Sequence, residues 1–347
     1  MPNYASANLV KAQTILTQRF NADELRYRQP VTFLEFRRQT EIMVPSHNLV
    51  RTREDRAVES NYMRRSARNL GTGGRTHNHT GTKGDSGVLT HTWVTRDDKF
   101  FYSLKQADNS VFTMNQQIAN ELGNVVANFA EGLETEAASF LFNNRSSVND
   151  YSREGTFNEG APTPPPTDVF EINEAANGDR AIQITKSAMD FMRYQGRVFT
   201  IFADSVAFNK FEKQANQGTG NSENLSFQYS NVNFIKSIDF DADAVALGYT
   251  NGFWIAVPEG SISVLDWIPV QNRQGVETKE NIYGTFINPV DSLSYATHEY
   301  QERSDETANN GFAQDVKTEV EVSVDLSFEH TPLSTANETS LLAFGLV

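Results

Sequence analysis

The stretch from Thr113 to Asn143, TMNQQIANELGNVVANFAEGLETEAASFLFN, decides the fold of this chain. Its apolar residues recur three or four positions apart, at Ile118, Leu122, Val125, Val126, Phe129, Leu133, Ala137, Phe140 and Leu141. This spacing places them on one face of an α-helix that would be about 45 Å long. Thr113 and Gln116 have the spacing of a capping box, so we expect the helix to begin here.

Two glycines lie inside this predicted helix. Gly123 and Gly132 each weaken a helix by about 1 kcal/mol relative to alanine, so the helix should depend on packing against the rest of the chain. By itself the pattern is that of the longest helix of a globular core. The segments before it in the sequence suggest a more specific arrangement.

The composition excludes several classes of protein. At 347 residues the chain is long enough for two or three hydrophobic cores. It has no cysteine, which excludes disulfides, thiolate metal sites and a cysteine nucleophile. No apolar run approaches the roughly 20 residues that cross a bilayer, and no signal peptide is recognisable. We therefore expect a cytoplasm-like compartment and no membrane partner.

The net charge of −14 is unevenly distributed. Residues 1–105 contain 17 Lys and Arg against 10 Asp and Glu, which gives +7. Residues 106–347 contain 13 against 34, which gives −21. A basic segment in so acidic a chain predicts contact with an acidic partner, either nucleic acid or, as we prefer, the acidic face of a neighbouring copy.

The segment before the glycine-rich loop is predicted to lie as an arm. A helix is expected over 4–20, whereas 31–44 shows no clear period. The basic residues that follow are Arg51, Arg53, Arg56, Arg64, Arg65 and Arg68. Because so little of this segment could bury itself, we interpret it as an arm that lies across another surface. The alternative is a solvated basic face.

Residues 71–87, GTGGRTHNHTGTKGDSG, are predicted to be a glycine-rich loop. Lys83 lacks the flanking Gly and Ser or Thr of a phosphate-binding loop, so that motif is excluded. His77 and His79 have a metal-like spacing, but no third ligand is near them in the sequence. No metal site is predicted.

A two-stranded ribbon is predicted after this loop. The segment 88–95, VLTHTWVT, is rich in β-branched and aromatic residues, and 99–104, KFFYSL, is similar. The charged residues at 96–98, RDD, are expected to turn the chain between them. A polar link at 106–110 then leads into the long helix.

The run from Thr92 to Leu141, with its order of ribbon, polar link and long helix, resembles the major capsid proteins of tailed bacteriophages, which have the HK97 fold. The resemblance is one of pattern and order, not of an invariant motif. It implies an α+β subunit with an N-terminal arm at 1–62, an extended β-ribbon loop (the E-loop) at 63–112, a peripheral domain with a spine helix at 113–180 and 285–330, and a mixed-sheet A-domain at 181–284 and 331–347.

The second half of the chain alternates helix and strand signals. Strands are predicted at 197–202, 232–235, 244–247, 253–257 and within 281–300, and helices at 182–194 and from Asp204 or Ser205 onward. From Glu319 to Glu329, EVEVSVDLSFE alternates apolar and polar residues. This predicts a half-buried strand whose acidic face is wet and suits a basic arm from another copy.

No catalytic motif is present in the sequence. It lacks the G-x-S-x-G elbow, the H-E-x-x-H helix and a glycine fingerprint after a strand, so neither an enzyme activity nor a cofactor is predicted. The single histidines His47, His91, His298 and His330 are interpreted as structural or surface residues. Some capsid proteins link loop lysines to asparagines of neighbouring subunits. Lys83 lies in that loop, but no partner is identifiable and no cross-link is predicted.

The resemblance implies a structural subunit that assembles as hexamers and pentamers into an icosahedral or prolate shell around double-stranded DNA, without reading its sequence. It implies scaffolding, portal and decoration proteins as further partners, the virion as location and the host cytoplasm as the place of assembly. The arm shows no helical pro-segment, so a scaffold would be a separate protein or absent. Candidate inter-subunit contacts are Arg64, Arg65, Arg68, Arg75, Lys83, Trp93, Phe100 and Phe101.

Two alternatives remain open. An encapsulin-type nanocompartment shell would share the fold and enclose an enzyme cargo in place of a genome. A carbohydrate- or surface-binding module would also account for a strand-rich acidic chain. That second alternative predicts a stable monomer and leaves the long helix and the glycine-rich loop unexplained.

Overall fold

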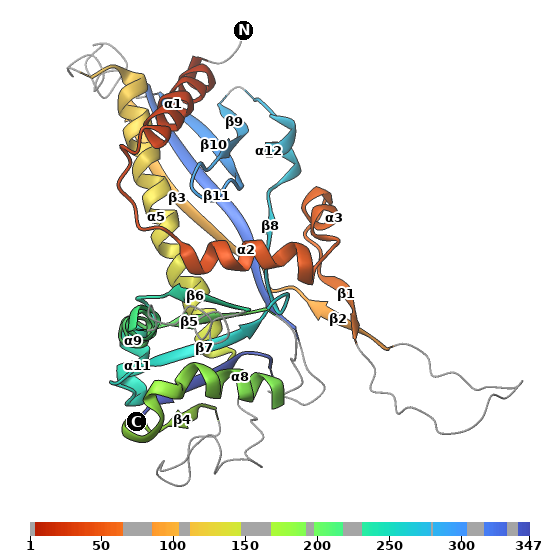
Figure 1. The fold of residues 1–347 in the computed structure, drawn as a ribbon. Helices are drawn as coiled ribbons and strands as arrows, with labels where there is room; N and C mark the ends of the chain where they lie inside the picture. Colours follow the sequence, from red (N-terminus) through yellow and green to blue (C-terminus); the bar gives the residue numbers. More distant parts are fainter. Residues whose placement is uncertain are drawn as a thin grey trace, which may run out of the picture.

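One long helix, α5 (Met114–Asn143), runs along much of the computed structural model (Figure 1). The structure describes residues 4–64, 85–103, 112–146, 168–191, 198–217, 231–278, 280–303, 316–331 and 339–347. The predicted capping box is present, because the Gln116 N–H donates to Thr113 Oγ1 and the Thr113 N–H donates to Gln116 Oε1. The predicted apolar face of α5 is buried apart from Phe140, which is half-buried.

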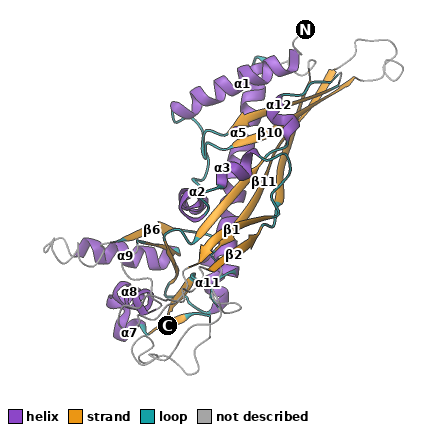
Figure 2. Ribbon diagram, turned by 90° about the vertical axis from the view of Figure 1, so that its right-hand side faces the viewer, coloured by secondary structure: helices purple, strands orange, loops and turns teal. Residues whose placement is uncertain are grey.

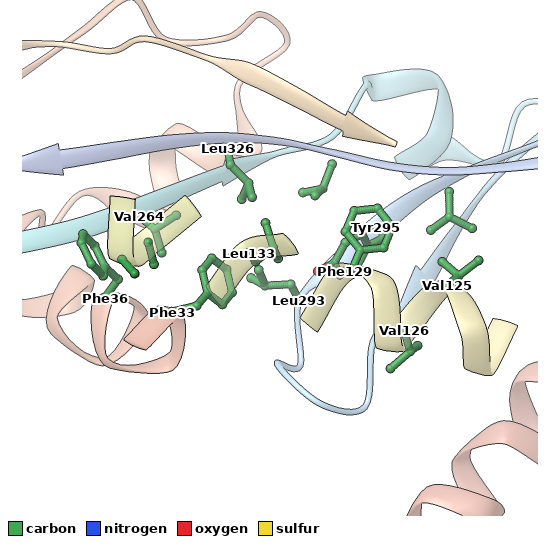
Figure 3. Close-up of a cluster of buried hydrophobic side chains, with 14 of the residues drawn as sticks. Phe33, Phe36, Val125, Val126, Phe129, Leu133, Val264, Leu293, Tyr295 and Leu326 are labelled. Carbon is green, nitrogen blue, oxygen red and sulfur yellow. The ribbon is translucent and has the colours of Figure 1, made fainter. Parts of the chain in front are cut away.

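The first sheet packs against this face of α5. Its antiparallel strands follow the order β3 (Val94–Ser103), β11 (Val316–His330), β10 (Ser294–Arg303) and β9 (Asn281–Ile287), and β8 (Ile262–Trp267) pairs with the last part of β11. Helix α1 (Tyr4–Asn21) packs on the first half of α5, and α12 (Val270–Gln274) lies beside β9 and β10. Phe129 of α5 meets Tyr295 of β10 with 4.7 Å between ring centroids (Figure 3).

The second sheet is mixed and holds a second core. Its order is β4 (Phe170–Ile172), β12 (Leu342–Leu346), β7 (Phe253–Pro258), β5 (Phe199–Ala203) and β6 (Val232–Lys236). The pairs β4–β12 and β5–β6 are parallel and the others are antiparallel. The helices of this half are α7 (Glu174–Asn177), the 3-10 turn η1 (Gly178–Arg180), α8 (Ala181–Phe191), α9 (Ser205–Gln217) and α11 (Phe240–Leu247). The predicted α+β class is confirmed.

Between the two sheets lies α2 (Val31–Met43), followed by α3 (His47–Thr52). The chain then enters a two-stranded ribbon of β1 (Glu59–Arg64) and β2 (Asp85–Thr90), which extends away from the body in Figure 1. Seen from the side, α5 and the first sheet form the long upper part of the molecule, and the second sheet with α8 and α9 forms the lower part (Figure 2). No described helix is long and apolar enough to span a membrane.

Two predicted segments have a different structure, and a helix forms where none was predicted. The residues RDD at 96–98 do not turn the chain but continue β3, which pairs along its whole length with β11. The ribbon is formed instead by β1 and β2. Residues 244–247 belong to the helix α11, which Gly248 ends in the left-handed conformation at φ 92°. Residues 31–43, which show no clear period, form the helix α2.

Strand pairing joins segments from both of the ranges expected for the A-domain and the peripheral domain. Strand β8, within 181–284, pairs with β11 of the first sheet, and β9, which crosses the boundary at 284, pairs with β10. Strand β4, within the range 113–180 expected in the peripheral domain, pairs with β12 of the second sheet. The pairing partners of these strands lie far along the chain, so local sequence does not reveal which sheet each strand joins.

Candidate assembly surface

A buried carboxylate of α5 caps the first turn of α2. Glu134 is fully buried, and its oxygens accept hydrogen bonds from Thr32 Oγ1 at 2.6 Å, the Thr32 N–H at 2.8 Å and the Phe33 N–H at 3.2 Å. The free N–H groups of a first helical turn carry partial positive charge, which suits a carboxylate. Burial raises the pKa of Glu134, and the hydrogen bonds from α2 oppose that rise. The bonds fix the start of α2 on α5.

A second buried carboxylate joins α2 to the second sheet. Glu35 accepts hydrogen bonds from Thr200 Oγ1 of β5 at 2.8 Å and from Gln39 Nε2 at 2.7 Å, and Arg38 donates to both of its oxygens. Burial alone would raise the pKa of Glu35, but these hydrogen bonds outweigh it and hold the pKa below its usual value. Gln39 Oε1 also accepts from the Gly260 N–H at 3.0 Å.

The first sheet holds α2 through Thr40 and two phenylalanines. Thr40 Oγ1 accepts from the Val264 N–H of β8 at 3.0 Å. Phe33 and Phe36 are fully buried, and each ring meets Phe328 of β11 edge to face. Helix α2 is therefore bonded to α5, to β8 of the first sheet and to β5 of the second. It sets how the two sheets sit relative to each other.

The root of the ribbon is tied to its own chain. Trp93 Nε1 donates to the carbonyl of Ala57 at 2.7 Å, and the His91 N–H donates to the carbonyl of Val58 at 2.8 Å. The His91 ring is buried, with Nδ1 at 3.0 Å from Glu329 Oε1. Beyond this root, the described residues of β1 and β2 pair with each other.

The arm segment before the ribbon also lies across strands of its own chain. Arg51 Nε is 2.8 Å from Asp266 Oδ2 of β8, and Trp267 Nε1 donates to the carbonyl of Arg53. The Arg56 guanidinium lies over the Trp267 ring, and its Nε is 3.6 Å from Asp325 Oδ2 of β11. The acidic face of β11 is therefore not uniformly wet as we expected. At Asp325 it is buried and meets an arginine of the same chain.

The predicted contact residues lie in different environments. Arg64 ends β1, while Arg65, Arg68, Arg75 and Lys83 fall outside the described residues, as do His77 and His79. Trp93 is half-buried at the ribbon root, and Phe100 packs against the main core. Phe101 is 56% exposed on the outer face of β3, where the Lys317 ammonium lies 4.7 Å from its ring centroid. Of the three described aromatic candidates, Phe101 is the one left open to a partner.

Other titratable side chains contact residues of their own chain. His298 stacks on Tyr283 with 4.7 Å between ring centroids. Glu299 of β10 is 2% exposed, and among the described side chains Tyr102 Oη hydrogen-bonds its carboxylate, at 3.5 Å. Burial raises the pKa of Glu299 to about 7. The described residues contain no group of three or more side chains that could hold a metal ion.

Sequence reasoning missed the residues that hold α2, although signals for them exist. Pro30 stands directly before α2, and proline near the start of a segment is compatible with a helix that begins there. Glu134 lies between Leu133 and Ala137 on the apolar face of α5, and a carboxylate there implies a buried hydrogen-bond partner. The identity of that partner, Thr32, is not readable from either segment.

Comparisons with known proteins give similarity in structure alone. No family model matches the chain, and no curated protein matches it. The mature capsid of bacteriophage PhiM1 matches at 12% identity and a TM-score of 0.45, over 85% of this chain and 83% of that chain. The capsid of cyanophage Pam1 matches at 12% identity and a TM-score of 0.45, over 84% of this chain and 86% of that chain. The capsid of cyanophage P-SCSP1u matches at 11% identity and a TM-score of 0.44, over 86% of this chain and 85% of that chain.

Proposed function

We propose that this chain is the major capsid subunit of a tailed-phage-like shell. The observation that carries the proposal is an elongated body built around α5 from which a ribbon extends, with β1 paired to β2 and to no other described strand. The sequence resembles the capsid family in its order of glycine-rich segment, strands and long helix, although the ribbon is formed by β1 and β2 and not by the segments 88–95 and 99–104.

The ribbon has the properties of a segment stabilised by a neighbour. A two-stranded hairpin is at best marginally stable in water. Val58 at its start is 69% exposed and Val88 within β2 is 53% exposed, so apolar surface is left uncovered on it. If each ribbon covers the next copy, the contact is heterologous, and repeating it around a ring closes a hexamer or a pentamer.

We assign the parts of the subunit accordingly. The first sheet with α5 would be the peripheral domain, the second sheet would be the A-domain around the local symmetry axes, and the ribbon would be the E-loop. The shell would enclose double-stranded DNA without reading its sequence. Scaffolding, portal and decoration proteins would be its further partners, with assembly in the host cytoplasm and the virion as final location.

Sedimentation and negative-stain imaging of the purified protein test the proposal. Closed shells support it, and a compact monomer that persists at high concentration and in crowding agents contradicts it and favours a binding module. The nucleic-acid or protein content of purified shells then distinguishes a phage capsid from an encapsulin-type compartment.

A ribbon variant gives a sharper test. Val88→Asp places a charge on an exposed position of β2, so the free subunit should stay folded while shells fail to form. Val88→Thr, which keeps the β-branched shape, is the matched control and should assemble. Normal assembly of Val88→Asp contradicts the role given to the ribbon.

A further inference from the structure

A groove of about 500 Å³ runs between β3 and α5. One wall is β3 at residues 96–98, and the other is the side of α5 from Asn128 to Ser139. The helix residues along it include Gly132 and the polar residues Asn128, Thr135, Glu136 and Ser139, with the apolar Phe129 and Leu133 among them. The ribbon contacts that the proposed function relies on do not assign an occupant to this groove.

The strand wall of the groove is the edge of a sheet. β3 ends the order of the first sheet and pairs with β11 on one side. Within the described residues no other strand pairs with it, so its second edge presents backbone N–H and C=O groups. Such an edge is a template for a further strand. A strand added there would lie on the flank of α5.

Gly132 is the helix residue that the chain itself does not explain. A Cβ at this position would meet no atom within 4 Å, whereas alanine would strengthen the helix by about 1 kcal/mol. Gly123 differs, because a Cβ there would lie 3.5 Å from Leu25 and 3.7 Å from Leu16. A glycine facing open space in the middle of a helix fits a chain that approaches the helix closely from outside.

The charge of the groove indicates what kind of segment would occupy it. Asp97, Asp98 and Glu136 line it against one guanidinium, Arg96, which pairs with Glu136 at 2.7 Å. Lys99, next to these lining residues, pairs with Asp97 at 3.0 Å, so three carboxylates face two cations and the net charge is −1. Residues 1–93, which precede β3, contain 14 Lys and Arg against 8 Asp and Glu, a net charge of +6, with several arginines in succession around the ribbon. The two are complementary.

We propose that an extended basic segment from the first third of a second copy lies in this groove, adds to the open edge of β3 and passes over Gly132. The inference rests on the proposed function and deepens it, because it names the surface on which the neighbouring arm or ribbon is received. The partner is a second copy of this chain, held by backbone pairing and by its arginines.

The first test fills the groove without weakening the subunit. Gly132→Gln puts a side chain over the helix flank and raises helix propensity. Its free subunit should unfold at a temperature no lower than wild type, while shell assembly slows at least tenfold. Gly123→Ala, the matched control in the same helix, should assemble at the wild-type rate. Assembly of Gly132→Gln at the wild-type rate overturns the proposal.

The second test identifies the occupant. The chain has no cysteine, so Ser139→Cys provides a single site for a photo-cross-linker. In shells made from a mixture of labelled Ser139→Cys and isotope-labelled wild-type copies, mass spectrometry should find links from this site to residues 1–93 of another copy. Links to residues 94–347, or links within one copy alone, overturn the assignment. Absence of shells from wild type would instead contradict the proposed function.

Discussion

The Glu134 carboxylate of α5 accepts both the hydroxyl and the N–H of Thr32, a residue 102 positions earlier in the chain. Both residues are buried, so the bonds are shielded from water. A carboxylate in such a place is stabilising only while its hydrogen-bond donors stay in position. The pair therefore couples the seating of α2 to the integrity of α5.

Replacing this carboxylate should destabilise the subunit. Glu134→Gln keeps the size of the side chain, and its amide can turn the oxygen to the two N–H groups and the NH2 to Thr32 Oγ1. The bonds to a charged carboxylate become bonds to a neutral amide, which should cost about 1–3 kcal/mol of unfolding free energy. Urea unfolding of the unassembled subunit measures it. Glu136→Gln is the matched control, since Glu136 pairs with the half-exposed Arg96 and its loss should cost less than about 1 kcal/mol. Equal losses would contradict the role of Glu134.

The hydrogen bond from Thr200 to Glu35, which joins α2 to the second sheet, should contribute to stability independently of the bonds between Thr32 and Glu134. Thr200→Val keeps the shape of the side chain but removes the hydroxyl that donates to Glu35, and should cost about 1.5–3 kcal/mol because the acceptor is charged. Hydrogen exchange should then rise in α2 and β5. Thr17→Val, at an exposed helix position, is the control and should change stability by less than about 0.5 kcal/mol.

Stability should fall as the pH rises through the range in which Glu299 titrates. Burial raises the pKa of Glu299 from its ordinary value of 4.5 to about 7. Between these values the folded state keeps a proton that the unfolded state has released, so the contribution is favourable below about 4.5 and lost by about 7. Glu299→Gln should remove this slope and be more stable than wild type at alkaline pH.

Chemical denaturation at a series of pH values checks that slope. Glu321→Gln, on the adjacent strand and 36% exposed, should keep the wild-type slope. If Glu299→Gln shows the same pH dependence as wild type, Glu299 is not the titrating group.

Gly345 should tolerate no side chain. A Cβ there would lie 2.4 Å from the ring of Tyr249, which is 4% exposed and cannot move aside freely. Gly345→Ala should cost about 1–3 kcal/mol through overpacking. In a double-mutant cycle with Tyr249→Leu, most of that loss should be recovered, whereas strict additivity would contradict the contact as its cause.

Local signals were sufficient where neighbours in sequence determine the structure. The start of α5 follows from Thr113 and Gln116, and its buried face follows from the helical spacing. The alternation along β11 likewise predicts a strand. Each of these patterns is complete within one segment, so no distant partner is needed to read it.

The wrong predictions have a common physical cause. Helix α2 buries Thr32, Glu35, Gln39 and Thr40 together with its phenylalanines, so no apolar period marks it. The charged residues at 96–98 resemble a turn, but they continue β3 because β11 supplies its hydrogen bonds. In both cases residues far along the chain determine the structure. The candidate groove is hidden for the same reason, since only the assembled sheet shows that β3 is its edge.

The pairing of early strands with late ones has a consequence for synthesis on the ribosome. Among the described strands β3 pairs with β11 alone, which emerges late, and β12, the last strand made, lies inside the second sheet. The part of α5 that the first sheet covers, and the apolar face of that sheet, therefore stay uncovered through most of translation. Contacts this distant slow folding, and uncovered apolar surface promotes aggregation. The nascent chain, rather than the finished subunit, is the form of this protein that most needs protection by chaperones.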